Sequence, residues 1–170
     1  LTMLEDLYQP YKPKRRTRAS IAREKGLQGL ADLILQQARL NRTAQQIAGD
    51  YLSAEVLSAE DALSGARDIV AETVSDHATV RGELRAKALR WGLIQCQKIE
   101  DSNDEKAVYE LYYAYEQRID RIKPYQVLAM NRGEMEKVLR IKIDVAERDW
   151  KGAIEIVFRP DRRSPLAEQL

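Results

Sequence analysis

The stretch SAEDALSGARDIVAETV, Ser58 to Val74, carries the clearest helical pattern in the chain. Ser58 is a favourable N-cap residue because its hydroxyl accepts a hydrogen bond from a free backbone N–H of the first turn. Asp61 follows three residues later, an acidic variant of the capping box that also suits the positive end of a helix. The inner-face residues recur at spacings of three and four, which is typical of an amphipathic α-helix. They are Ala59, Ala62, Leu63, Ala66, Ile69, Val70, Thr73 and Val74.

Weaker signals of the same kind lie on both sides of this helix. We expect the last turns of a helix at 1–8, a short helix at 21–25 capped by Ser20, and further helices at 27–39, 43–48, 76–91, 105–122 and 124–132. Ser75 and Asp76 are expected to cap the helix at 76–91, and Gly92 and Gly133 to end the helices before them. The stretch 93–100 fits either a short strand or an extended loop.

Two runs near the C-terminus, at 138–143 and 154–158, contain residues that favour strands. A polar stretch separates them, so we expect them to pair as a small hairpin. The sequence thus predicts a mainly α fold, an irregular multi-helix scaffold with a minor β-hairpin element near the C-terminus. Residues 1–133 would form the helical domain. Residues 134–170 would add the small β element and the start of a truncated helix to that same domain.

Both ends of the chain have features of cut ends. Leu1, Leu4 and Leu7 have helical spacing with no N-cap before them. Ser164 and Pro165 are typical of the start of a helix, yet only about one more turn follows, too little for a helix that is stable alone. We therefore expect the sequence to be a fragment of a larger protein.

The net positive charge is concentrated in the stretch YQPYKPKRRTRASIAREK, Tyr8 to Lys25. Residues 11–25 hold seven Lys or Arg and one Glu, a net charge of +6, whereas the whole chain carries only +1. The remainder of the chain therefore sums to −5. Pro10 and Pro13 lack a backbone donor and restrict the residues before them, so we expect an extended arm up to Ser20.

This basic arm is a candidate phosphate-binding segment, because clustered Lys and Arg neutralise the backbone of nucleic acids. The candidate contacts are Lys12, Lys14, Arg15, Arg16 and Arg18. The alternative is a solvated loop, or a loop whose cations pair with carboxylates elsewhere in the protein. Tyr8 and Tyr11 fit either a role in stacking on bases or one in anchoring the arm to a helix. Charge alone leaves these hypotheses open.

The stretch DLYQPYKPKRRTRASIAREKGL, Asp6 to Leu27, resembles a segment near the start of the N-terminal helical region of the Tex family. Tex proteins are bacterial transcription accessory proteins. Further matching pieces follow in the expected order: LSGARDIVAE at 63–72, LRWG at 89–92 and YQVLAMNRGEMEKVLRIKI at 125–143. The resemblance therefore spans nearly the whole chain.

The resemblance implies a multidomain, nucleic-acid-binding factor linked to transcription. Members of the family carry, beyond a helical N-terminal part, an inactive nuclease-like fold, a helix-hairpin-helix module and an S1 RNA-binding domain. This chain would be the helical scaffold alone, without those recognised modules. The implied partners are RNA or DNA, mainly through the missing modules, and the transcription machinery.

No residue pattern indicates catalysis, a metal site or a cofactor. His77 is the only histidine and Cys96 the only cysteine, and neither has a suitable partner near it in sequence. We expect Cys96 to be a buried structural thiol. The four tyrosines within 109–115 are interpreted as core or interface residues, because Glu110 and Glu116 would repel the phosphates of a stacked nucleic acid.

Composition sets the expected cellular setting. A hydrophobic content of 44% and a charged content of 32% fit a soluble globular protein. No apolar run approaches the length that spans a membrane, and one cysteine excludes an internal disulfide. We expect a cytoplasmic, non-enzymatic protein without cofactor or membrane partner. Two hypotheses for its function remain: an arm that contacts phosphates, or a scaffold that docks on its own chain or on the transcription machinery.

Overall fold

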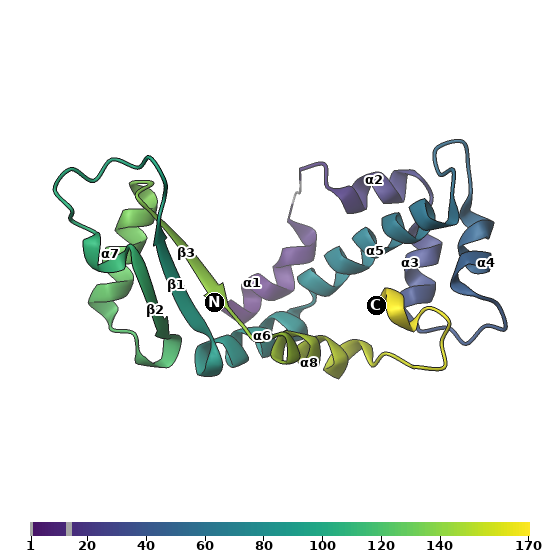
Figure 1. Ribbon diagram of the computed structural model, residues 1–170. Coiled ribbons are helices and arrows are strands. Elements are labelled where there is room, and N and C mark those ends of the chain that lie inside the picture. The colour runs from purple at the N-terminus through teal and green to yellow at the C-terminus, as the bar shows by residue number, and fades with distance from the viewer. Residues whose placement is uncertain (1, 13–14) are drawn as a thin grey trace. The chain divides into compact units, whose positions relative to one another are not determined.

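The computed structural model describes residues 2–12 and 15–170, and the chain divides into two compact units. The first unit comprises the residues up to Gly82 together with Ala153–Leu170, and the second comprises Glu83–Gly152. The architecture is mainly α with one small sheet, which confirms the predicted fold class (Figure 1). The predicted organisation of 1–133 and 134–170 as one domain stays a prediction.

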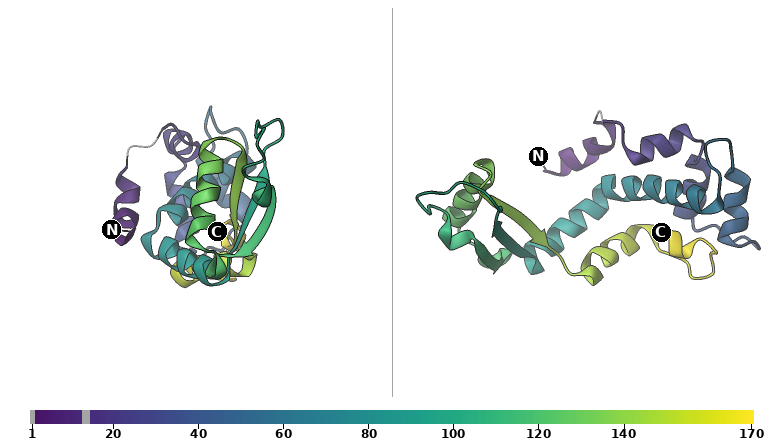
Figure 2. Two further views of the ribbon diagram at one scale, coloured as in Figure 1. Left: turned by 90° about the vertical axis from the view of Figure 1, so that its left-hand side faces the viewer. Right: turned by 45° about the horizontal axis from the view of Figure 1, so that its top comes forward.

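The first unit is organised around the long helix α5 (Ala59–Asp76). Three shorter helices pack on it, namely α2 (Arg18–Glu24), α3 (Gln28–Leu35) and α4 (Ala44–Ala48), as the two views of Figure 2 show. The unit also contains α1 (Thr2–Tyr8) and the 3₁₀ turns η1 (Gln9–Tyr11), η2 (Gly49–Tyr51) and η5 (Ala167–Gln169). Two helices contribute residues to both units: α6 (Ala78–Trp91) and α8 (Glu147–Phe158).

Helix α5 begins as the sequence predicts, because the Ser58 hydroxyl accepts a hydrogen bond from the Asp61 N–H at 3.1 Å. Its inner face is fully buried at Ala62, Ala66 and Ile69. Gly65 lies on this face where the chain between α2 and α3 comes closest. A methyl group at Gly65 would overlap the Cδ1 atom of the buried Leu27. Small residues on α5 therefore let its neighbours approach closely.

The second unit is a three-stranded antiparallel sheet with a helix beside it. Its strands are β1 (Leu93–Lys98), β2 (Ala114–Arg118) and β3 (Leu139–Asp144), in the order β2-β1-β3. Helix α7 (Pro124–Met135) packs against β3, and the 3₁₀ turns η3 (Glu110–Tyr112) and η4 (Ile119–Arg121) flank β2. Cys96 pairs with Tyr115 on one side and Ile141 on the other, and it belongs to the buried cluster with Met130 and Leu139.

The predicted C-terminal hairpin is wrong. The run at 139–144 does form a strand, but its partner is β1, whereas the run at 154–158 lies in α8. Ile154, Val157 and Phe158 are spaced for one helix face, and they pack on the core of the first unit. Tertiary packing here overrides the strand preference of β-branched residues.

The helix predicted over 105–122 is also wrong, since η3 and β2 occupy that stretch. The Asp104 carboxylate accepts hydrogen bonds at 3.0 Å from the N–H groups of Val108 and Tyr109, and one at 2.8 Å from the Tyr113 hydroxyl. These bonds hold the chain in a compact turn. The residues after the turn are then available to pair with β1.

Three predicted helix boundaries need correction. The basic segment is not extended up to Ser20, because α2 already begins at Arg18. Ser75 and Asp76 continue α5 instead of capping the next helix, and the chain turns at the extended His77. Gly133 does not end its helix, which runs to Met135.

Two further boundaries lie near Ser164 and Gln37. Ser164 does not start a helix; its hydroxyl donates to the Ala38 carbonyl at 3.0 Å, and only η5 follows. The helix expected at 27–39 ends at Leu35, because Gln37 adopts a left-handed conformation with φ of 52°. Together these contacts place Leu166 in the core of the first unit, where it is fully buried.

We predict that Gly65→Ala destabilises the first unit. The added methyl overlaps Leu27 in a packed core, so the free energy of unfolding should fall by about 1–3 kcal/mol. The matched control is Gly82→Ala in α6, where an added methyl meets nothing within 4 Å. That variant should be neutral or up to about 1 kcal/mol more stable, from helix propensity alone. Urea unfolding followed by circular dichroism measures both, and equal effects would contradict the close contact.

We also predict that Asp104 makes the stability of the second unit depend on pH. Partial burial acts to raise the pKa of Asp104, but hydrogen bonds from Tyr109, Tyr113 and Val108 and the nearby Lys98 lower it overall. A lowered pKa means that the ionised form stabilises the fold at neutral pH, and that this contribution disappears as pH falls through the folded-state value.

The Asp104→Asn variant should therefore be less stable than the wild type at pH 7, with the difference shrinking in acid. Both tryptophans, Trp91 and Trp150, lie in the second unit, so their fluorescence reports its unfolding. The exposed Asp101→Asn variant is the control and should follow the wild-type pH profile. A constant difference between Asp104→Asn and wild type across pH would show that the charge of Asp104 is irrelevant.

Candidate nucleic-acid interface

The start of α2 orients the basic segment. The Thr17 hydroxyl accepts a hydrogen bond from the Ser20 N–H at 3.0 Å, and the Ser20 hydroxyl accepts one from the Thr17 N–H at 2.9 Å. This reciprocal pair is a capping box, with Thr17 and not Ser20 as the N-cap. Arg18 consequently lies in the first turn of a helix, and Arg15 and Arg16 lie directly before the cap.

The Glu72 carboxylate of α5 binds two residues of this segment. Glu72 forms an ion pair with Arg23, with 2.6 Å between Oε1 and Nη1, and its other oxygen accepts a hydrogen bond from the Thr17 hydroxyl at 3.0 Å. The Glu72 side chain is only 16% exposed, so its charge is largely removed from water. Arg23, which belongs to the basic stretch 8–25, thus helps to hold the scaffold together, as the alternative hypothesis requires.

The five predicted phosphate contacts do not share one environment. Lys12, Arg15 and Arg18 are exposed, and within residues 2–12 and 15–170 none of them has a carboxylate within ion-pair distance. Arg16 pairs with Glu24 at 3.1 Å, but both side chains are more than half exposed. Such a surface pair contributes little and is easily exchanged. Lys14 lies outside the described residues.

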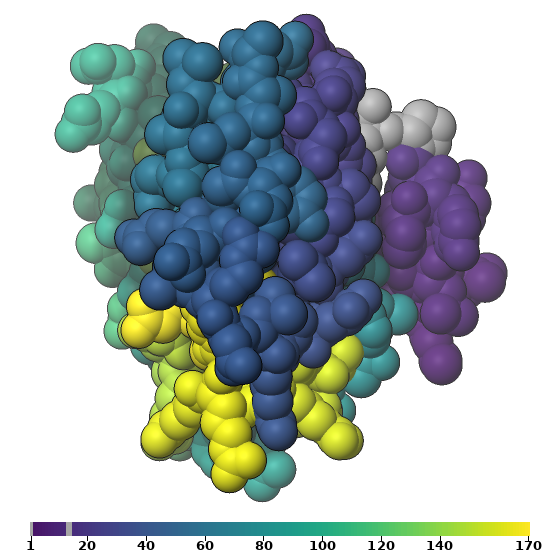
Figure 3. Space-filling view, turned by 90° about the vertical axis from the view of Figure 1, so that its right-hand side faces the viewer, coloured from purple at the N-terminus to yellow at the C-terminus, as the bar shows by residue number. Residues whose placement is uncertain are grey.

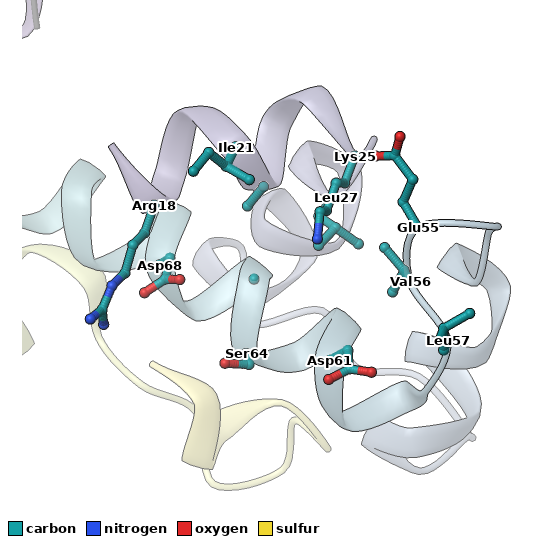
Figure 4. Close-up of a pocket in the computed structure, with 12 residues that line it drawn as sticks. Arg18, Ile21, Lys25, Leu27, Glu55, Val56, Leu57, Asp61, Ser64 and Asp68 are labelled. Atoms are coloured by element: carbon teal, nitrogen blue, oxygen red, sulfur yellow. The ribbon is translucent and has the colours of Figure 1, made fainter. Parts of the chain in front are cut away.

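Residues of α2 and α5, among them Arg18 and Asp68, line a hollow of about 420 Å³. Figure 4 shows these side chains. Both cations and carboxylates line it, since Lys25, Asp61 and Glu55 also border the space. The hollow therefore offers no concentrated positive charge to an anion. Arg18, which lines this hollow, is exposed to solvent.

A second hollow of about 490 Å³ lies between the end of η1, α2 and the end of α5. Its lining includes Lys12, Arg23, Glu72 and His77, again of mixed charge. The Nδ1 atom of His77 is buried without a hydrogen-bond partner among the described residues. Its ring packs edge-on against Phe158, with 5.5 Å between centroids, so His77 has a packing role here.

The remaining candidate groups are structural. Cys96 is fully buried, and burial, together with the nearby Glu134, raises the pKa of its thiol. A thiol with a raised pKa is a poor nucleophile. No group of three or more His, Cys, Asp or Glu suited to a metal ion occurs in the described parts of the chain. None of the described helices is both long and apolar enough to cross a membrane.

The tyrosine cluster lies in the core of the second unit, as interpreted from the sequence, although not on one helix. Tyr109 and Tyr112 are buried. The Tyr109 hydroxyl donates to Glu136 at 2.8 Å, and the ring of Tyr112 packs edge-on against that of Tyr115. Burial and the hydrogen bond to Glu136 raise the pKa of Tyr109. These rings are committed to internal contacts and offer no open platform to bases.

Comparison with known proteins decides the family. Residues 40–166 match the family model described as Tex central region-like. The chain belongs to the Tex family. The predicted family is confirmed. The region differs, because the family model describes the matched residues as central, whereas the sequence analysis assigned the chain to the N-terminal helical region.

Three relatives illustrate the match. The chain is 41% identical to the uncharacterized protein YdcI of Bacillus subtilis, covering 100% of this chain and 24% of the relative. It is 37% identical to Protein tex of Bordetella pertussis, covering 82% of this chain and 18% of the relative. It is 39% identical to the transcriptional accessory protein Tex of Neisseria gonorrhoeae, covering 84% of this chain and 18% of the relative. The chain therefore spans about a quarter or less of the length of these Tex-family relatives.

Two features of this Tex-family chain were missed by the sequence analysis. Glu72 was not recognised as the partner of Arg23, because 49 residues separate them in the chain. Trp91, the last residue of α6, is 53% exposed and lies beside two arginines. The guanidinium carbons of Arg90 and Arg118 lie 4.8 Å and 5.6 Å from its ring centre. Neither arrangement has a local signal in the sequence.

We predict that Glu72→Gln loosens α2. The amide keeps the shape of the side chain but loses the charge that Arg23 needs, so the free energy of unfolding should fall by about 1 kcal/mol, a value reduced for the partial exposure of Arg23. The control is Glu60→Gln, whose ion pair with Arg67 is largely exposed. It should change stability by less than about 0.5 kcal/mol. Equal values in thermal unfolding would show that Glu72 is not an anchor.

Proposed function

We propose that this chain is a non-catalytic helical scaffold of a Tex-like transcription accessory factor, and that its basic segment contacts nucleic-acid phosphates. The proposed contacts are Lys12, Lys14, Arg15, Arg16 and Arg18. The observation that supports this most is that Lys12, Arg15 and Arg18 are exposed without a carboxylate partner among the described residues. Arg23, in contrast, is neutralised by Glu72.

Charge distribution supports the same proposal. The segment at 11–25 carries +6 while the rest of the chain carries −5, so the net attraction of the chain for a polyanion comes from this segment. A helix cap and an ion pair hold the end of this segment on α5, which lowers the entropy lost when the cations bind. Contacts to phosphate oxygens would be independent of base sequence.

The relatives supply the biological context of the proposal. The name of the Neisseria gonorrhoeae relative describes a transcriptional accessory protein, and we propose a role in transcription for this chain as well. The proposed partners are RNA or DNA, with the transcription machinery as a protein partner. The single buried thiol, Cys96, fits the reducing cytoplasm in which we propose that the protein acts.

The second candidate function is protein docking. It is favoured by one observation, the large apolar side chains that α1 leaves exposed, of which Leu4 and Leu7 are examples. Salt dependence separates the two functions, because phosphate binding weakens steeply with salt whereas contact between apolar surfaces does not.

The test is a titration of the 170-residue chain against single- and double-stranded oligonucleotides at several salt concentrations. In the triple variant Lys12→Ala, Arg15→Ala, Arg18→Ala the slope of log affinity against log salt should flatten by roughly 2–3, because each lost phosphate contact removes about 0.7–0.9. The melting temperature should hardly change, since these side chains are exposed.

A matched control removes the same amount of charge elsewhere in the first unit. The triple variant Arg42→Ala, Arg67→Ala, Arg162→Ala replaces three exposed arginines outside the basic segment. Its salt slope should stay near that of the wild type. An unchanged slope in the first variant together with a lowered melting temperature would refute the phosphate contacts and favour the docking function.

A further inference from the structure

A buried carboxylate joins α1 to α6. Among the described residues of α1, Asp6 is the one that is buried, at 3% exposure. Its Oδ1 atom lies 2.9 Å from the Nε atom of Arg81, which belongs to the first turn of α6 and is 75 residues away in the chain. Both residues belong to the first unit. The ion pair is therefore a long-range contact inside that unit.

A pair of this kind is a better source of geometry than of stability. Removing one partner of a buried ion pair is strongly unfavourable, but replacing both partners by neutral residues often leaves the stability unchanged. A charge-assisted hydrogen bond is nevertheless directional, and it forms only when donor and acceptor are aligned. Any rotation of α1 would separate Asp6 from Arg81. The pair consequently fixes the orientation of α1 on the first unit.

The orientation of α1 in turn sets the position of Lys12. Helix α1 ends at Tyr8, whose backbone angles are helical with φ of −83° and ψ of −18°, and η1 begins at the next residue. The N–H of Lys12 then donates a hydrogen bond to the Gln9 carbonyl at 3.3 Å. The chain is thus helical from Asp6 up to Tyr11, with no extended link. A movement of α1 would carry Lys12 with it.

A different carboxylate holds the cations that follow. Glu72 of α5 pairs with Arg23 and so fixes α2, the helix that begins at Arg18. Lys12, Arg23 and Glu72 border the same hollow of about 490 Å³, so the end of η1 lies beside this second anchor. Figure 3 shows α1, in the darkest purple, at one edge of the view. The spacing between Lys12 and Arg18 therefore depends on two separate ion pairs.

We propose that Asp6 and Arg81 are positioning residues for the phosphate contact of Lys12. The inference rests on the proposed function and adds to it two residues that need not touch nucleic acid themselves. Binding loses less entropy when a cation is already held in place than when the ligand has to order it. With the pair intact, Lys12 is held at a fixed place relative to Arg18. Without the pair, the ligand itself has to order α1 and Lys12.

The test variant is Asp6→Ala, Arg81→Ala. It removes the pair without leaving a buried charge and without changing the net charge, so the long-range attraction of a polyanion is unaltered. The 170-residue chain is titrated with a single-stranded oligonucleotide labelled with fluorescein. We expect the affinity to fall by about two- to tenfold, the range for one long side chain that has to be ordered on binding.

The deciding measurement is the coupling between the pair and Lys12. Lys12→Ala should weaken binding by the wild-type chain several-fold, but should weaken binding by the double variant less than twofold. Arg18→Ala should weaken both chains by the same factor, because α5 and not α1 holds α2 in place. A merely structural role of the pair would not make the effect of Lys12 differ from that of Arg18. Equal factors for Lys12→Ala in the two chains would overturn the inference.

The matched control is Glu60→Ala, Arg67→Ala, which removes another ion pair of the first unit with no change in net charge. It should leave the affinity within twofold of the wild type, and a loss equal to that of the test variant would contradict the positioning role. Circular dichroism shows whether each chain is folded. If the test variant does not fold, Arg81→Lys takes its place, because it keeps a cation opposite Asp6 but loses the guanidinium geometry. Lys12→Ala should then cost at least twofold less affinity in Arg81→Lys than in the wild type, and equal costs would again overturn the inference.

The same titrations distinguish a failure of this inference from a failure of the proposed function. If the wild-type chain does not bind the oligonucleotide, or if Lys12→Ala binds as tightly as the wild type, the phosphate contact of Lys12 is refuted and the positioning role with it. If Lys12→Ala weakens binding but Asp6→Ala, Arg81→Ala binds as tightly as the wild type, the phosphate contact stands. In that case only the positioning role of Asp6 and Arg81 is overturned.

Discussion

The close contact between α5 and the chain joining α2 to α3 is the constraint on which the first unit depends. Gly65 has no side chain, and the space that a methyl group would occupy is filled by Leu27. Ala62 and Ala66, on the same face, are fully buried. A larger residue at this crossing would push α2 outwards and separate Thr17 from Glu72. The position of the basic segment on α5 therefore depends on the packing of these small residues.

Electrostatics divides the basic segment into two groups. Arg23 is neutralised by a largely buried carboxylate on α5 and so belongs to the scaffold. Lys12, Arg15 and Arg18 are exposed without such a partner in the described parts of the chain. Basic residues that look alike in the sequence therefore differ in the structure: Arg23 is paired within the scaffold, whereas the other three can bind a ligand. Asp6 is an acidic residue in a buried site, where it forms an ion pair with Arg81. The large apolar residues of the same helix are exposed to solvent.

Local sequence determined the elements whose signals are local. Ser58 caps α5, the apolar spacing along that helix gives its buried face, and Gly92 follows the end of α6. The mainly α fold, the buried Cys96 and the internal role of the tyrosines also followed from composition and spacing. The family followed from long motifs, not from physical reasoning about residue types. The predicted nucleic-acid contacts remain predictions, although the charge that motivates them is evident from the sequence.

Tertiary structure decided what depends on partners distant in the chain. The run at 154–158 is equally suited to a strand, and it is helical because one of its faces packs on the first unit. The stretch after Asp104 becomes a turn and a strand because β1 supplies the pairing edge. Likewise, only the fold shows that Arg23 meets Glu72 and that Asp6 meets Arg81, pairs separated by 49 and 75 residues. Sequence patterns report the preference of a segment for its own conformation, whereas burial and charge pairing depend on which segments meet in space.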